Sequence, residues 1–154
     1  MIEVQIDDSA WRQPGPRLTE QVRRAARIAL ARADSGKKRN GGLTVLLTGD
    51  DRLQMLSRDY RGKDKPTNVL SFPGTTSDYL GDIAIAFGTT AAEAQGAGVP
   101  LVNHLLHLTV HGVLHLLGYD HERSEDAEIM EALETTILAD MDIANPHPQR
   151  GRAA

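Results

Sequence analysis

The stretch from Val99 to Leu117 has helical spacing and is apolar on nearly every side, which constrains the fold more than any other part of the chain. Leucines occupy much of its circumference, and Pro100 falls in the first turn, where a helix tolerates proline. Gly118 follows at the position where helices commonly end in a left-handed conformation. A helix without a wide polar face must be covered by protein. The other segments of the chain therefore have to pack around this one.

Short apolar runs alternate with amphipathic segments through the remainder of the chain. We predict strands over 1–6, 43–48, 68–73 and 80–87, and helices over 18–33, 51–60, 89–98 and 124–141. Asp50, Thr89 and Ser124 are the predicted N-caps of three of these helices. Interleaved strands and helices are typical of an α/β or α+β fold. We therefore predict a small mixed four-stranded sheet with about five to six helices, one of them the buried central helix.

Length and composition limit the class of protein. A chain of 154 residues, 40 % of them apolar, is expected to form one domain, which we place at residues 1–145. A disordered tail is predicted over 146–154, where prolines and arginines recur. The acidic start, MIEVQIDDSAW, is unlike a secretory signal, and no apolar run is long enough to span a membrane. We therefore expect a cytoplasmic protein that does not bind membranes, and the sequence indicates no oligomeric state.

Several histidines share one side of the predicted central helix. A stripe about 80° wide, at about 100° per residue, contains His104, His107, His111 and His115. The spacing of His111 and His115, four residues apart, places their side chains one turn apart, as two ligands of one metal require. After Gly118 the chain can reverse and return His121 as a third ligand. The sequence therefore predicts a metal site at the end of the buried helix.

The run HGVLHLLGYDH has the ligand spacing of the metzincin zinc proteases. The chain has no cysteine, so imidazole and carboxylate groups must hold any transition metal. In the metzincins the residue after the first histidine is a glutamate that acts as general base, whereas this chain has Gly112. A site of three imidazoles still leaves a fourth position open for water. The sequence therefore predicts a metal site without the base of the proteases, and metal-dependent hydrolysis stays possible at this site.

Three segments resemble one known family, the YbeY endoribonucleases of bacteria, which are also described as rRNA maturation factors. HGVLHLLGYDH resembles the histidine signature of that family, YRGKDKPTNVLSFP its second signature, and LGDIAIAF the strand that follows. The resemblance implies one zinc ion per chain, held by His111, His115 and His121. It also implies a functional arginine at Arg61. The implied activity is hydrolytic cleavage of single-stranded RNA, in maturation of the 3′ end of 16S ribosomal RNA and in ribosome quality control, with the ribosome or its small subunit as partner.

A local basic segment is needed if the chain binds RNA, because its net charge of −4 gives no general attraction to a polyanion. RDYRGKDK, residues 58–65, has four basic residues in eight and is predicted to be a loop. The guanidinium of Arg61 can bind a phosphate through two hydrogen bonds and stabilise charge that develops during hydrolysis.

Asp120, next to His121, is a further catalytic candidate. It could act as a base or orient a metal ligand, or it could be a turn residue without a chemical role.

Two other functions stay open. A zinc peptidase is favoured by the metzincin-like spacing and opposed by Gly112. A non-catalytic ribosome-assembly factor would hold a structural zinc, which usually has four protein ligands. His104 or His107 could supply the fourth ligand, although we expect both to be core residues or to support the ligands from behind. His147 lies in the predicted tail and is expected to have no role.

Overall fold

The computed structural model describes residues 1–33, 41–62, 67–76 and 78–147. The elements in these ranges are β1 (Ile2–Ile6), a 3-10 helix η1 (Ser9–Arg12), α1 (Leu18–Arg32), β2 (Gly42–Thr48), α2 (Asp50–Arg61), β3 (Val69–Pro73), β4 (Tyr79–Ala86), α3 (Phe87–Ala97), α4 (Leu101–Leu116) and α5 (Ser124–Ala139). The predicted mixed fold, with four strands and five to six helices, is confirmed. No helix among the described residues is long and apolar enough to cross a membrane.

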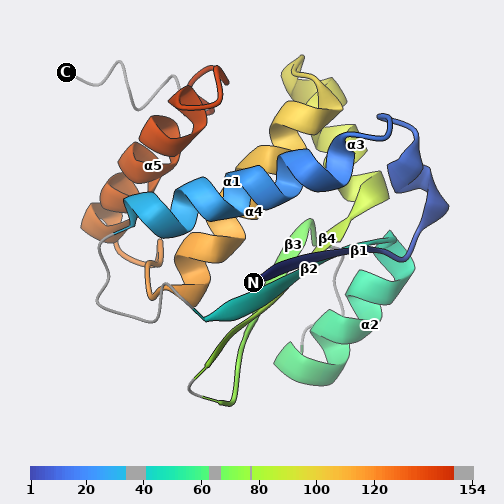
Figure 1. Cartoon of the computed structure of the whole chain (residues 1–154), viewed down its shortest axis with the longest axis horizontal. Coiled ribbons are helices and arrows are strands. Elements are labelled where there is room, and N and C mark those ends of the chain that lie inside the picture. The colour runs from blue at the N-terminus through green and yellow to red at the C-terminus, as the bar shows by residue number, and fades with distance from the viewer. Residues whose placement is uncertain (34–40, 63–66, 77, 148–154) are drawn as a thin grey trace.

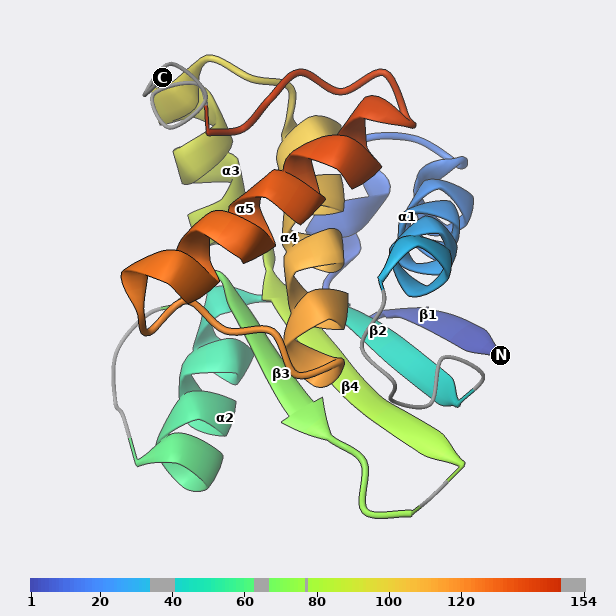
Figure 2. The same ribbon diagram turned by 90° about the vertical axis from the view of Figure 1, so that its left-hand side faces the viewer.

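The sheet has the strand order β1-β2-β4-β3. β1, β2 and β4 run parallel to one another, whereas β3 is antiparallel to β4 and forms an edge of the sheet. Figures 1 and 2 show α1, α4 and α5 on one face of the sheet and α2 on the other. Both faces are therefore covered, and β4, which lies inside the sheet, is accordingly buried along most of its length.

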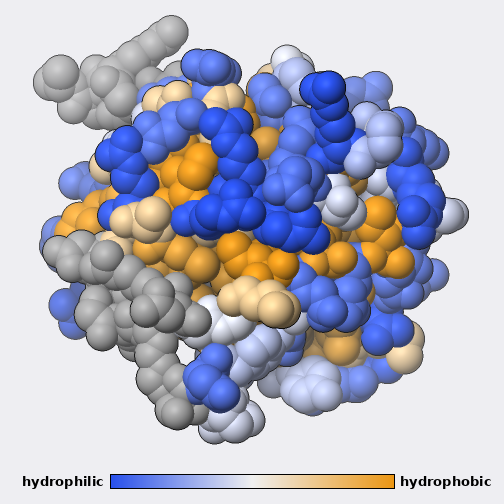
Figure 3. Space-filling view, in the orientation of Figure 1, coloured by the Kyte–Doolittle hydropathy of each residue, from blue (hydrophilic) through white to orange (hydrophobic). Residues whose placement is uncertain are grey.

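Helix α1 separates the core from one outer surface of the molecule. It buries Val22 and Ala26 and exposes Arg24 and Arg27, as its amphipathic spacing predicts. Hydrophilic side chains accordingly cover the outer face of this helix in Figure 3. The inner face packs on α4, which also contacts α3, α5 and the strands β3 and β4. The central helix is thus surrounded by protein, as its composition requires.

The end of α4 has the predicted geometry. Gly118 has a φ of 102°, and the N–H groups of Gly118 and Tyr119 donate to the carbonyls of His115 and Leu114, each at 3.0 Å. This left-handed turn reverses the chain directly after the second histidine of the HGVLHLLGYDH run. At the other end, Pro100 is the N-cap rather than part of the first turn.

The three predicted N-caps are wrong by one to three residues. Gly49 caps α2, Ala86 caps α3 and Arg123 caps α5. Asp50 instead accepts a hydrogen bond from the backbone N–H of Thr89 at 3.0 Å, so its carboxylate lies at the N-terminus of a different helix, α3. A carboxylate is stabilised at a helix N-terminus whichever helix supplies it.

Candidate metal centre

Three histidines from two neighbouring segments converge at the end of α4. His111 and His115 lie on the helix, and the turn after Gly118 returns His121 beside them. One ligand nitrogen from each of the three rings lies within 4.8 Å of the others. The ring centroid of His121 is 5.5 Å from that of His111 and 5.1 Å from that of His115. The three residues predicted as ligands are therefore brought together.

The donor atoms fit a zinc ion. Two imidazole nitrogens bound to one tetrahedral zinc ion at 2.0–2.1 Å are about 3.3 Å apart. The Nε2 atoms of His111 and His115 are 3.1 Å apart and face each other. Two unprotonated imidazole nitrogens repel at this distance unless a cation or proton lies between them. Among the described residues this group has three members and no fourth ligand, which leaves an open position as in catalytic zinc sites.

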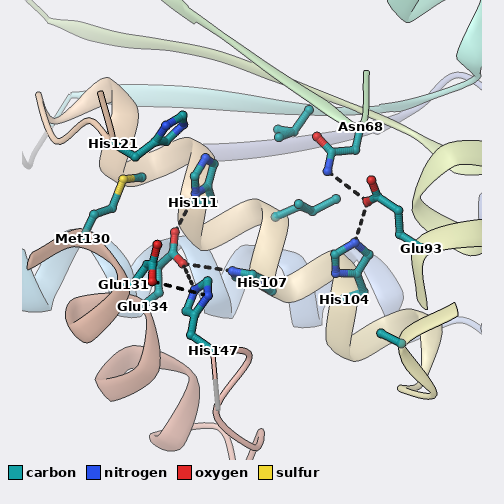
Figure 4. Close-up of a pocket in the computed structure, with 13 residues that line it drawn as sticks. Asn68, Glu93, His104, His107, His111, His121, Met130, Glu131, Glu134 and His147 are labelled. Carbon is teal, nitrogen blue, oxygen red and sulfur yellow. Dashed lines mark hydrogen bonds and ion pairs between the residues drawn. The ribbon is translucent and has the colours of Figure 1, made fainter. Parts of the chain in front are cut away.

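Glu134 on α5 orients the first of these ligands. Its Oε2 atom lies 2.6 Å from Nδ1 of His111, and its side chain is only 1 % exposed. In this pairing the Nδ1 atom of His111 carries the proton and donates, so Nε2 is unprotonated and directed at His115. A carboxylate behind a ligating histidine in this way fixes the tautomer and makes the imidazole a better ligand. Figure 4 shows Glu134 below His111, with His121 on the other side.

The electrostatics of the site favour the protonation states of His115 and Glu134 that suit metal binding. The pKa of His115 is lowered to about 4, chiefly by burial and in addition by the neighbouring imidazoles of His111 and His121. A neutral imidazole is the form that binds metal. Burial alone would raise the pKa of Glu134, but hydrogen bonds from His107, His111 and His147 outweigh that effect and hold its pKa well below the usual range. The carboxylate is therefore ionised at neutral pH.

Gly112 lies where the glutamate of a zinc peptidase would be, and its surroundings leave no room for a side chain. A Cβ atom at this position would be 2.8 Å from Cγ2 of Ile83 in β4, a β-branched and fully buried side chain. The carbonyl of Gly112 also accepts a hydrogen bond from Ser71 Oγ at 3.2 Å. This side of α4 thus packs closely on the sheet.

A cleft of about 550 Å³ runs from the histidines along the edge strand β3. Its lining includes Val69, Ser71 and Pro73 from β3, Thr67 and Asn68 just before it, and Asp120, His111, His115 and His121 at the metal centre. The cleft therefore joins the predicted metal ligands to the segment that follows the basic residues.

The basic segment 58–65 is only partly a loop, contrary to the prediction. Its first four residues form the last turn of α2, and Gly62 ends that helix with a φ of 68°. Arg61 is the last residue of α2, and its side chain lies outside the described part of the structure, as do Lys63 and Lys65. The role of Arg61 in binding phosphate therefore stays a prediction.

Asp120 lies at the turn that returns His121. Its Oδ1 atom accepts a hydrogen bond from the backbone N–H of Glu122 at 3.3 Å, which gives it the structural role of a turn residue. The residue is exposed and also lines the cleft. A role in proton transfer is thus compatible with its position.

The remaining histidines each face a carboxylate. His104 Nε2 lies 2.8 Å from Oε1 of Glu93, which also accepts a hydrogen bond from Asn68 at 2.9 Å. His107 Nε2 lies 3.0 Å from Oε1 of Glu134, so it supports His111 indirectly, as expected.

The predicted placement of His147 in a disordered tail is wrong. Its Nε2 atom lies 2.7 Å from Oε1 of Glu134, and the residue is partly buried rather than part of a disordered tail. Residues 148–154 of the predicted tail lie outside the described residues.

The sequence also did not identify Glu134 and Asn68 as residues that contact the histidines or their partners. Glu134 is one of several glutamates on an acidic helix, and no spacing rule distinguishes it.

Comparison with known proteins gives a consistent result. The family model described as Endoribonuclease YbeY matches residues 5–142. A protein named Endoribonuclease YbeY from Rhodopseudomonas palustris (strain HaA2) is 43 % identical, over 99 % of this chain and 84 % of its own length. A protein of the same name from Paramagnetospirillum magneticum is 44 % identical, over 97 % of this chain and 96 % of its own length. A solution structure from Thermotoga maritima shares the fold, with a TM-score of 0.60 and 24 % identity over 100 % of this chain and 99 % of that one. On this extent of similarity, the chain belongs to the YbeY family.

Proposed function

We propose that this chain is a zinc-dependent endoribonuclease that cuts single-stranded RNA. The observation that carries the proposal is the convergence of His111, His115 and His121 at the end of an open cleft, with no carboxylate among the three. The family supplies the reaction class, since the matching relatives are named as endoribonucleases. The geometry supports His111, His115 and His121 as the residues that hold the metal.

The three histidines would hold one zinc ion per chain. When bound, zinc supplies Lewis-acid charge to a phosphodiester and makes water a nucleophile near neutral pH. His111 and His115 present Nε2 atoms to the site, and Glu134 holds the His111 ring through Nδ1. Because burial lowers the pKa of His115 to about 4, this imidazole is neutral and able to bind at pH 7.

The shape of the cleft favours a single strand as substrate. Its volume of about 550 Å³ falls within the range of about 300–1,000 Å³ that is typical of small-molecule sites. A site of this size holds about one or two nucleotides of a single strand. Thr67, Asn68 and Ser71 offer polar groups for ribose and phosphate oxygens along its wall. A strand along β3 would present one phosphodiester to the histidines.

Arg61 is proposed to bind the phosphate that is cut. It ends α2, and the first described residues beyond the basic segment, Thr67 and Asn68, line the cleft. A guanidinium there would bind two phosphate oxygens and stabilise the charge that develops on them. Asp120 is the proposed proton-transfer group, because it is an exposed carboxylate next to His121 and lines the cleft, as Glu122 does on the other side of that histidine.

The cellular substrate we propose is ribosomal RNA, with cleavage at the 3′ end of 16S rRNA and the small ribosomal subunit as partner. A cytoplasmic location fits that substrate. One domain over residues 1–145 would carry the activity, with His147 packed against it.

The alternative of a peptidase is disfavoured by Gly112. The structure has no space for a glutamate at position 112, because its Cβ atom would lie too close to the side chain of Ile83. A phosphodiester, which carries negative charge, also suits a chain with a basic segment at residues 58–65 better than a neutral peptide does. The alternative of a structural zinc is disfavoured because the histidine group has three members within the described ranges, and structural zinc sites usually have four.

The test compares substrates and variants of one preparation. Wild-type protein is expected to cut a single-stranded RNA, to leave the matching duplex largely uncut and to leave casein intact. His111→Ala, His115→Ala and His121→Ala should each lose RNA cleavage and the zinc bound at this site, because two imidazoles do not hold the metal firmly. His104→Ala, on the same face of α4 but paired with Glu93, is the matched control. Proteolysis without RNA cleavage would refute the proposal, and RNA binding without cleavage would favour an assembly factor.

A further inference from the structure

A second group of metal-binding side chains lies beside the first. His107 on α4, Glu134 on α5 and His147 beyond α5 each direct one ligand atom to a common point, and these atoms lie within 4.8 Å of one another. The Nε2 atoms of His107 and His147 are 3.0 Å and 2.7 Å from the same carboxylate oxygen, Oε1 of Glu134. Figure 4 shows the two rings approaching this oxygen from different elements.

The two oxygens of Glu134 have separate partners. Oε2 accepts the hydrogen bond from His111, whereas Oε1 faces only the second group among the contacts described for it. A carboxylate can therefore bind a metal through Oε1 while it continues to orient His111 through Oε2. Glu134 thus contacts the first group through one oxygen and belongs to the second group through the other.

The donor set is that of a known class of zinc site. Two imidazoles and one glutamate, with a fourth position for water, hold zinc in several metallopeptidases. Glu134 is 1 % exposed and His107 is 16 % exposed, so both are held by their surroundings before any ion arrives. A cavity of about 390 Å³ borders the group and leaves room for a fourth ligand.

We propose that His107, Glu134 and His147 form a second divalent-metal site, suited to zinc, next to the site of His111, His115 and His121. It lies where α4, α5 and the C-terminal segment meet, so an ion there would bind this segment to the two helices. The proposal is independent of the reaction catalysed at the first site. The opposing explanation is a hydrogen-bonded group in which both imidazoles donate their Nε2–H to Glu134.

The experiment counts zinc in the full chain, purified without a histidine tag. Metal is removed with a chelator, zinc is added back in small excess and unbound metal is removed by gel filtration. Wild-type protein is expected to retain two zinc ions per chain, and His107→Ala and His147→Ala one each. His104→Ala is the matched control, because it lies on the same helix face outside both groups, and it should retain two.

The first site is followed separately with His115→Ala. This variant should also retain one zinc ion, and the double variant His115→Ala/His147→Ala none. Circular dichroism is used to check that each variant is folded. Thermal melting gives a second measurement, because added zinc should raise the Tm of His115→Ala and not that of the double variant.

Two results would overturn the proposal: one zinc ion per wild-type chain that persists in His107→Ala and His147→Ala, or two ions that persist in these variants. Loss of one ion in these variants supports it whether or not RNA is cut. A preparation that binds two zinc ions and cuts no RNA would therefore contradict the proposed nuclease activity and leave the second site standing.

Discussion

The Nδ1 atom of His111 lies 2.6 Å from Oε2 of Glu134, although the two residues belong to different helices. This contact joins the ligand helix α4 to α5 through a carboxylate that is almost completely buried. It fixes which nitrogen of His111 can bind metal. The packing of α5 on α4 is therefore part of the metal centre and not only part of the core.

Replacing this carboxylate should weaken the first metal site. Glu134→Gln removes the negative charge behind His111, and losses of such groups cost about 10–100-fold in metal affinity. Because Glu134 also belongs to the second group, the comparison is made in the His147→Ala background. Glu131→Gln, on the same helix near His147, is the matched control and should change the zinc Kd much less. An unchanged zinc Kd in Glu134→Gln would show that Glu134 does not orient the ligand.

Arg61→Ala should remove RNA cleavage and leave zinc binding and folding intact. The expected role of Arg61 is to bind phosphate and not metal. Arg61→Lys should recover only part of the activity, since an ammonium group lacks the planar pair of donors. Cleavage rates and zinc content are measured on the same samples. Full cleavage by Arg61→Ala would exclude Arg61 from the site.

The close packing of Gly112 gives a prediction for stability. Gly112→Ala should lower the free energy of unfolding by about 1–3 kcal/mol, because the new Cβ meets the stiff side chain of Ile83. Gly96→Ala is the contrasting control, since this helical glycine of α3 is exposed and has nothing within 4 Å of the new Cβ. It should raise the free energy of unfolding by up to about 1 kcal/mol. Urea denaturation distinguishes the two, and equal effects of the same sign would contradict the packing argument.

The convergence of the three histidines could be predicted because they are close in sequence. The separation of His111 and His115 is one helical turn, and Gly118 specifies the reversal that returns His121. These are local features, and local geometry follows from local sequence. The buried position of α4 could be predicted for a similar reason, since a helix with apolar residues on nearly all sides has to be covered.

The residues that support the centre could not be predicted in the same way. Glu134 resembles the other glutamates of α5 in sequence, and only the packing of that helix on α4 brings it to His111 and His107. His147 follows Asn145 and Pro146 in a segment that resembles a flexible tail, yet it reaches Glu134. Asp50 was predicted as a local cap and instead contacts another helix. Each of these errors concerns a contact between elements that are distant in sequence.

The most direct test of the account is RNA cleavage by chelator-treated protein as zinc is added back. The account predicts no cleavage of single-stranded RNA without metal, recovery as zinc fills the site of His111, His115 and His121, and no recovery in His115→Ala at the same zinc concentrations. His104→Ala should recover as the wild-type protein does. Undiminished cleavage by the metal-free protein, or full recovery in His115→Ala, would contradict the central claim that these three histidines hold the catalytic metal.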